Sequence, residues 1–228
     1  MKKNVVLFEL IPILVTLAGI LGFGIAYGQV AVKLAPVCVS LVVMLFNSRA
    51  NRWGFILGGL NSILYAVGYF MEGLYGSVFS ACFGAVMQFV TFFFWKRRAY
   101  GKATIFRRMK GKTEILFGIG FLVAWFVAAL VLRRAGGTEF VLDSMSMLLG
   151  FVLPVLTMFA YLESLPLNLV NMAVSLTLWI RIVVAGNLAN LTYLVYSVYC
   201  AYMTLRQTVR WIRLYREQCA AKNGDREE

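Results

Sequence analysis

The chain contains the stretch Met87-Gln-Phe-Val-Thr-Phe-Phe-Phe-Trp-Lys-Arg-Arg98, in which an apolar run ends in a cluster of positive charges. One amide side chain, that of Gln88, lies inside the apolar part. No water is available to an amide at that depth in a bilayer, so such a side chain usually faces other helices or a substrate path. The stretch therefore predicts a membrane-spanning helix and makes Gln88 a candidate binding residue.

The composition of the whole chain indicates the same environment. Hydrophobic residues make up 61% of the 228 residues, charged residues make up 14%, and the mean hydropathy is +0.79. A soluble domain of this size with this composition would expose extensive apolar surface. We therefore expect an all-α integral membrane protein that forms a single transmembrane domain over residues 1–228.

Apolar runs long enough to cross a bilayer, about 20 residues each, recur along the chain and divide it into eight predicted spans. These spans cover residues 6–27, 30–46, 54–70, 75–95, 114–132, 140–161, 165–184 and 188–202. The last span is followed by the basic segment 203–228. We expect this segment to be a cytoplasmic tail that ends at the membrane surface.

Lysine and arginine are distributed unevenly between the two sides of these spans. With eight spans, eighteen of the basic residues fall on the side that holds both termini, and the other side keeps only Lys33, Arg133, Arg134 and Arg181. Cytoplasmic loops retain positive charge during insertion. Both termini are therefore expected in the cytoplasm, whereas a seven-span arrangement would scramble this asymmetry.

Several function classes are disfavoured by the residue content. The basic residues form short loops beside the spans, not a patch interleaved with stacking aromatics, so the net charge of +12 does not indicate nucleic-acid binding. Contact with the lipid bilayer, and with its anionic headgroups, explains them better. The chain has no histidine, and its four cysteines have no close pair. We therefore expect no metal, no other cofactor and no enzymatic activity.

The acidic residues give no sign of energy coupling. Proton- and sodium-driven pumps usually need a carboxylate at membrane depth, but the candidates all fall near predicted span ends: Glu9, Glu72, Glu114, Glu139, Asp143 and Glu163. No phosphate-binding loop of an ATPase occurs either. Movement of a solute down its gradient is therefore expected, although an ion held by backbone carbonyls would leave no such signature.

Two parts of the chain have a similar pattern of apolar elements. A shift of 113 residues superposes Gly73, in a turn of the first part, on Gly186 in the second. Transporters built from two parallel three-helix bundles have such repeats, with a central site between them. The bundles would be residues 30–95 and 140–202, joined by a linker helix at 114–132, with 6–27 as an extra N-terminal helix.

A series of motifs then points to a known family: Trp53-Gly-Phe-Ile-Leu-Gly58, Asn61-Ser-Ile-Leu-Tyr65, Gly73-Leu-Tyr-Gly76, the stretch Met87 to Lys96, and Leu142-Asp-Ser144. From about Val30 to Gln207 the chain resembles the PnuC family of bacterial vitamin transporters. The resemblance implies a three-plus-one-plus-three bundle similar to SWEET sugar carriers, which lies in the bacterial inner membrane and facilitates uptake of nicotinamide riboside. In relatives the solute is thiamine or another vitamin or nucleoside. It also implies trapping by a cytosolic vitamin kinase and a homo-oligomeric assembly.

One motif departs from that family. Members that carry nicotinamide riboside have Trp-x-x-Trp-x-x-x-Asn early in the sixth core helix, and here the stretch reads Leu165-Pro-Leu-Asn168-Leu-Val-Asn171-Met172. Leu165 and Asn168 stand in place of the tryptophans, so the aromatic clamp for a flat ring is missing. A more polar substrate, or one held differently, is therefore an alternative.

We expect a central site lined by polar and aromatic side chains from both halves. The polar series at 168, 171 and 175 lies on one helical face with a tryptophan one turn further. The predicted substrate-binding residues are Gln88, Asn61, Tyr65, Asn168, Asn171, Ser175, Trp179 and Tyr196. Hydrogen bonding between helices is the alternative for the polar residues, and anchoring at the membrane interface is the alternative for the tyrosines. A non-transporting membrane subunit or sensor remains the alternative of a different class.

Overall fold

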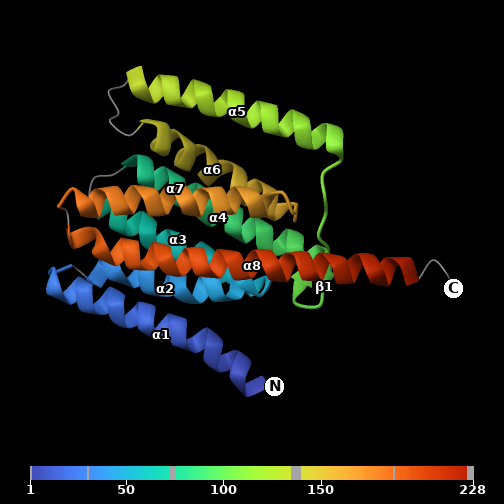
Figure 1. Ribbon diagram of the computed structural model, residues 1–228, viewed down its shortest axis with the longest axis horizontal. Helices are drawn as coiled ribbons and strands as arrows, with labels where there is room; N and C mark the ends of the chain where they lie inside the picture. Colours follow the sequence, from blue (N-terminus) through green and yellow to red (C-terminus); the bar gives the residue numbers. More distant parts are fainter. Residues whose placement is uncertain (1, 30, 72–74, 135–139, 187, 225–228) are drawn as a thin grey trace.

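The computed structural model describes residues 2–29, 31–71, 75–134, 140–186 and 188–224. Within these ranges the chain forms eight α-helices that run alternately in opposite directions (Figure 1). They are α1 (Lys2–Ala26), α2 (Ala31–Ser48), α3 (Trp53–Met71), α4 (Tyr75–Arg97), α5 (Gly111–Arg134), α6 (Phe140–Met158), α7 (Ser164–Val184) and α8 (Leu191–Gly224). A short hairpin of β1 (Ala99–Tyr100) and β2 (Ala103–Thr104) follows α4, and a 3₁₀ turn, Leu188–Asn190, precedes α8. Each predicted span therefore falls on one helix.

The helix ends lie within four residues of the predicted span ends, except at the end of α8. The sixth span was expected to reach Tyr161, but α6 ends at Met158 because the chain turns there. The eighth span was expected to end at Tyr202, but α8 is 34 residues long and ends at Gly224, so most of the predicted tail is part of that helix. Val30, Gly73 and residues 225–228 lie outside the described residues.

Six of the helices form a closed ring. In order around it, α2 packs on α3, α3 on α4, α4 on α6, α6 on α7, α7 on α8, and α8 returns to α2. α1 lies outside the ring against α2 and α8, and α5 lies outside it against α6 (Figure 1). The seam between α2 and α8 includes a hydrogen bond from the Tyr199 hydroxyl to the Leu41 carbonyl, at 2.9 Å.

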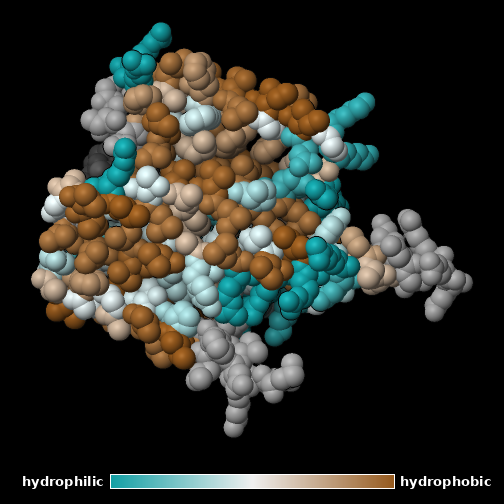
Figure 2. All heavy atoms as spheres, viewed as in Figure 1, coloured by the Kyte–Doolittle hydropathy of each residue, from teal (hydrophilic) through white to brown (hydrophobic). Residues whose placement is uncertain are grey.

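The outer surface of the ring is largely apolar. No part of the apolar segment Gly111–Val131 of α5 is buried, and this segment and Phe140–Met158 are each long and apolar enough to cross a membrane. Shorter apolar segments occupy residues 10–26, 34–48 and 53–68. Figure 2 shows apolar side chains over the body of the bundle and hydrophilic ones gathered at the end that carries the hairpin. A surface of this kind suits lipid better than water.

α2 and α6 end in the same backbone motif. Ala50 and Ala160, each two residues beyond a helix end, have positive φ angles of 51° and 58°. The Ala50 N–H donates to the Asn47 carbonyl and the Ala160 N–H to the Thr157 carbonyl, both at 3.0 Å, and in each case the next N–H donates five residues back. These are Schellman caps with alanine where glycine is usual, at a cost of about 1–2 kcal/mol each. α2 and α6 therefore end alike.

Two buried tryptophans join neighbouring helices of the ring at these caps. The indole N–H of Trp95 on α4 donates to the Thr157 carbonyl on α6 at 2.9 Å, and that of Trp211 on α8 donates to the Asn47 carbonyl on α2 at 3.1 Å. The two indole centroids lie 5.5 Å apart, and the Phe106 ring contacts both. We call Trp95, Trp211 and Phe106 the tryptophan clasp. One indole bond joins α4 to α6 and the other joins α8 to α2. The clasp therefore closes the ring at the hairpin end.

The loop between α4 and α5 is held against this same end. Gln218, near the end of α8, accepts the Phe106 N–H through Oε1 and donates through Nε2 to the Thr104 carbonyl, both at 2.9 Å. Glu163, just before α7, accepts the Met109 N–H at 2.9 Å. The C-terminal part of α8 therefore packs on the loop, and this packing explains why it does not separate as a surface tail.

A Gln218→Ala protein is expected to lose the two hydrogen bonds that attach the loop between α4 and α5 to α8. Each lost hydrogen bond to a backbone group costs about 1 kcal/mol, so the melting temperature should fall and trypsin should cut the loop faster, at Lys102 or Arg107. Glu217→Ala is the matched control, because Glu217 is an exposed neighbour on the same helix. Equal cleavage rates in both variants would show that Gln218 does not hold the loop.

Candidate functional site

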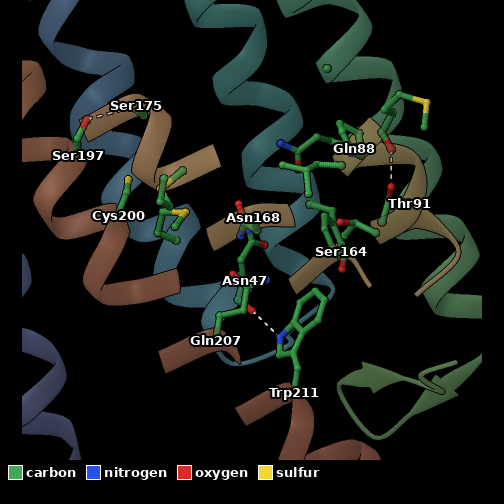
Figure 3. Close-up of a pocket in the computed structure, with 18 of the residues that line it drawn as sticks. Asn47, Gln88, Thr91, Ser164, Asn168, Ser175, Ser197, Cys200, Gln207 and Trp211 are labelled. Atoms are coloured by element: carbon green, nitrogen blue, oxygen red, sulfur yellow. Dashed lines mark hydrogen bonds between the residues drawn. The ribbon is translucent and has the colours of Figure 1, made fainter. Parts of the chain in front are cut away.

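A cavity of about 320 Å³ lies at the centre of the ring. Its volume is at the lower end of the range usual for small-molecule sites, about 300–1,000 Å³. All six ring helices contribute to it (Figure 3): Met44, Asn47, Phe55, Gly84, Met87, Gln88, Thr91, Leu153, Pro154, Thr157, Ser164, Asn168, Met172, Ser175, Tyr196, Ser197, Cys200, Gln207 and Trp211. None of these described residues carries a charge at neutral pH. The cavity is thus suited to a solute that needs hydrogen bonds and apolar contact but no ion pair.

Four amide side chains supply most of the hydrogen-bonding capacity. Asn47 comes from α2, Gln88 from α4, Asn168 from α7 and Gln207 from α8, so four different helices contribute one amide each. The oxygens of the Asn47 and Gln88 amides are buried and accept no hydrogen bond within the described part of the chain. A buried acceptor without a donor costs about 1–3 kcal/mol. Retaining two such groups beside a cavity is typical of a binding site, not of a core built for stability.

The apolar part of the lining is aromatic and sulfur-rich. Phe55, Tyr196 and Trp211 present rings, and the methionines among the lining residues present thioethers. Methionine side chains adapt to the shape of a ligand and contact aromatic rings favourably. The faces of aromatic rings also attract cations. The lining therefore offers several surfaces to a flat or positively charged ring even without the tryptophans of the family motif.

Four of the eight predicted binding residues line the cavity, namely Gln88, Asn168, Ser175 and Tyr196. Ser175 also lies 3.4 Å from the Ser197 hydroxyl, which joins α7 to α8 beside the cavity. The face of α7 that was expected to be functional thus does point inward. Whether these side chains bind substrate remains a prediction.

Asn61 and Tyr65 are not among the residues that line this cavity, and their place in the substrate site remains a prediction. Asn61 is buried and donates to the Ser40 hydroxyl on α2 at 2.7 Å, and the Tyr65 hydroxyl lies 3.4 Å from the same oxygen. Polar side chains of α3 are therefore used between helices.

Asn171 and Trp179 also lie outside the lining. Asn171 is about 60° around α7 from Asn168, enough to place it beside the inward face. Trp179 is on that face but nearer the other end of the ring, where its ring stacks on that of Tyr193 with centroids 4.8 Å apart and an angle of 14° between planes. The cavity does not extend to that end.

Sequence reasoning missed Asn47, Gln207 and Trp211. Asn47 lies just beyond the predicted end of the second span, and the other two lie beyond the predicted end of the eighth span. A polar residue in the last turn of an apolar helix was the available signal for Asn47. No pattern in the sequence indicated that α8 would return Gln207 and Trp211 to the cavity.

Positive charge gathers just outside the cavity, at the hairpin end. The pKa of Arg49, which follows the end of α2, is lowered. The main cause is partial desolvation, and the nearby charges of Arg210 and Arg206 add to it. Burial also lowers the pKa of Arg210, with further repulsion from Arg206 and Arg213. The arginines nevertheless remain protonated, so this end of the ring has a positive potential.

An uncharged polar cavity enclosed by helices whose outer faces are apolar is the arrangement of a membrane transporter for a small solute. The chain matches the sequence profile of the nicotinamide mononucleotide transporter family over residues 30–213, and it belongs to that family. The crystal structure of the vitamin B3 transporter PnuC has the same fold, with a TM-score of 0.74 and 18% sequence identity over 92% of each chain. A comparison with curated proteins finds no significant match.

The expected resemblance to PnuC transporters is therefore confirmed. The protein is an all-helical, multi-pass protein of the inner membrane that belongs to a family of vitamin transporters. This membership also accounts for the extensive apolar outer surface, which lipid covers.

Proposed function

We propose that the protein mediates facilitated uptake of nicotinamide riboside, which a cytosolic vitamin kinase then traps by phosphorylation. The observation that supports this most directly is the central cavity, whose lining combines amides with aromatic rings and has no charged group among the described residues. A nucleoside fits that chemistry, because its sugar hydroxyls and carboxamide need hydrogen bonds while its ring needs an apolar cover.

The absence of charge in the lining favours a nucleoside over a mononucleotide. A phosphate group carries close to two negative charges at neutral pH, and burying it without a cationic partner is very costly. The positively charged ring of nicotinamide riboside is easier to accommodate, because the rings of Trp211, Tyr196 and Phe55 can cover a cation. Phosphorylation in the cytosol would therefore prevent return through the same cavity.

The three-plus-one-plus-three arrangement is part of this proposal. The two matching caps, at Ala50 and Ala160, support two related halves, α2–α4 and α6–α8, with α5 as the linker and α1 as the added helix. The two indole bonds add support, since the last helix of each half bonds the first helix of the other. The halves would rock about the cavity and expose it to each side in turn.

The hairpin end is proposed to be the cytoplasmic end. α1 begins on the side of the bundle that carries the hairpin, and α8 runs past the hairpin before it ends (Figure 1). The basic residues of the loops gather on this side, as the rule for cytoplasmic loops requires. On this assignment both termini are cytoplasmic and the tryptophan clasp is the inner gate. Opening it would break the two indole bonds and admit the substrate to the cytosol. A homo-oligomer in the membrane also remains part of the proposal.

Ligand-induced thermal stabilisation of the purified protein tests the choice of solute. A ligand that binds the folded state raises the apparent melting temperature by mass action, by an amount equivalent to about 2.7 kcal/mol at a concentration 100 times its Kd. We expect nicotinamide riboside to raise the melting temperature and nicotinamide mononucleotide to leave it unchanged. Thiamine, riboflavin, pyridoxine and other nucleosides complete the set.

Each outcome of this experiment has a distinct meaning. A shift with thiamine or another nucleoside alone would replace the proposed solute but keep the site. A shift with the mononucleotide equal to that with the nucleoside would contradict the argument from charge. If no compound in the set shifts the melting temperature, a non-transporting membrane subunit or sensor becomes the better interpretation.

A further inference from the structure

α3 carries two adjacent glycines where it packs on α4. A Cβ atom placed on Gly58 would approach the Gln88 amide most closely at Oε1 and would lie 2.7 Å from both Cδ and Nε2, and one placed on Gly59 would lie 2.8–3.0 Å from the ring carbons of Phe89. Real Cβ atoms do not approach other atoms so closely. Each glycine therefore leaves room for one neighbour on α4, but only Gln88 belongs to the cavity lining.

The Gln88 amide lies across the backbone of α3 at Gly58. Its oxygen is buried there with no hydrogen-bond donor within the described part of the chain, and Gln88 is one of the lining residues labelled in Figure 3. The oxygen is the amide atom nearest to Gly58, so the donor end is the one more open to a ligand. Because Gly58 has no side chain, the Gln88 amide can lie against α3 and does not extend further into the cavity.

A second amide rests on α3 in the same manner. A Cβ atom placed on Gly54 would lie 2.6 Å from Oδ1 of Asn47. Gly54 and Gly58 are four residues apart and so lie on one face of α3, one helical turn apart. Amides from α2 and α4, on either side of α3, are therefore both seated on its backbone at the wall of the cavity.

We infer that Gly58 is a positioning residue for substrate binding, which acts by seating the Gln88 amide with its N–H groups toward the cavity. The ligand group received there is a neutral hydrogen-bond acceptor, such as a carboxamide or hydroxyl oxygen. An added methyl group at residue 58 would push the amide into the space that the ligand needs. This inference rests on the proposed function, because it assumes that the cavity binds the solute.

A double-mutant cycle on the affinity for nicotinamide riboside separates this role from a general packing role. The variants are Gly58→Ala, Gln88→Ala and the double variant, with Gly59→Ala as the matched control. We expect Gly58→Ala to weaken binding at least fivefold and to cause no further loss in the Gln88→Ala background. Gly59→Ala disturbs the same helix pair at Phe89, so it should lower the melting temperature without changing the affinity.

The opposite results are equally clear. Equal loss of affinity in Gly58→Ala and Gly59→Ala, or a Gly58→Ala effect that persists in full without the Gln88 amide, would overturn the positioning role while leaving the proposed function intact. If the wild-type protein binds neither nicotinamide riboside nor another solute of the vitamin set, the proposed function fails and the inference fails with it.

Discussion

A Gln88→Met protein is expected to bind nicotinamide riboside at least tenfold more weakly than the wild-type protein while being no less stable. Methionine has nearly the volume of glutamine but no hydrogen-bonding amide, so the ligand loses its partner at residue 88. A tenfold loss corresponds to about 1.4 kcal/mol, within the range for one or two hydrogen bonds in a buried site.

The expected stability of the Gln88→Met protein without ligand has a separate physical cause. The Gln88 amide oxygen is buried without a donor in the described structure, so its removal relieves a cost of about 1–3 kcal/mol in the empty protein. The melting temperature without ligand should therefore stay the same or rise. Binding sites commonly show such opposition between stability and function.

Titration calorimetry and a thermal melt of the same samples measure both quantities. Val86→Met is the control, because Val86 lies two residues away on α4 and its side chain is 60% exposed on the outside of the bundle. A Gln88→Met protein that binds as well as wild type would remove Gln88 from the site. One that melts much earlier would show that the amide is structural.

A Trp211→Ala protein is expected to show the largest loss of stability of any single change considered. Trp211 is only 1% exposed, contacts Trp95 and Phe106, and donates to the Asn47 carbonyl. Truncation of a buried tryptophan costs about 3–5 kcal/mol. The loss also unfastens α8 from α2, so the hairpin end of the ring should open.

Trp211→Phe separates the packing of the clasp from its hydrogen bond. The ring is retained while the indole N–H is lost, and the Asn47 carbonyl keeps its bond from the Ala50 N–H, so we expect a loss of only about 1 kcal/mol. Trp53→Ala is the control for tryptophan truncation, because that side chain is 53% exposed. If Trp211→Ala and Trp53→Ala melt at the same temperature, the clasp does not hold the ring closed.

The helices could be predicted from the sequence because each depends on a local property. An apolar run of about 20 residues must become a helix in lipid, since no other backbone structure satisfies its own hydrogen bonds there. The full length of α8 was missed because its second half is polar. That part is held by long-range contacts of Trp211 and Gln218, which no local pattern reveals.

The candidate site was predicted only in part, for a related reason. Gln88 stands out because it is an amide within an apolar run, and Asn168 and Ser175 share a helical face. Asn61 has the same kind of signal, yet its amide bonds Ser40 on α2. A helical face gives the direction of a side chain but does not say whether a cavity or another helix lies in that direction. Distinguishing the two requires the packing of the whole ring.

We propose that the six-helix cavity carries a nucleoside down its gradient. Counterflow in proteoliposomes tests this most directly. Vesicles that contain the purified protein are loaded with unlabelled nicotinamide riboside, and entry of the labelled compound is followed without any ion gradient. We predict rapid entry through the wild-type protein, little entry through the Gln88→Met protein, and no competition by the mononucleotide. No entry through the wild-type protein, or entry that requires a proton or sodium gradient, would contradict the account.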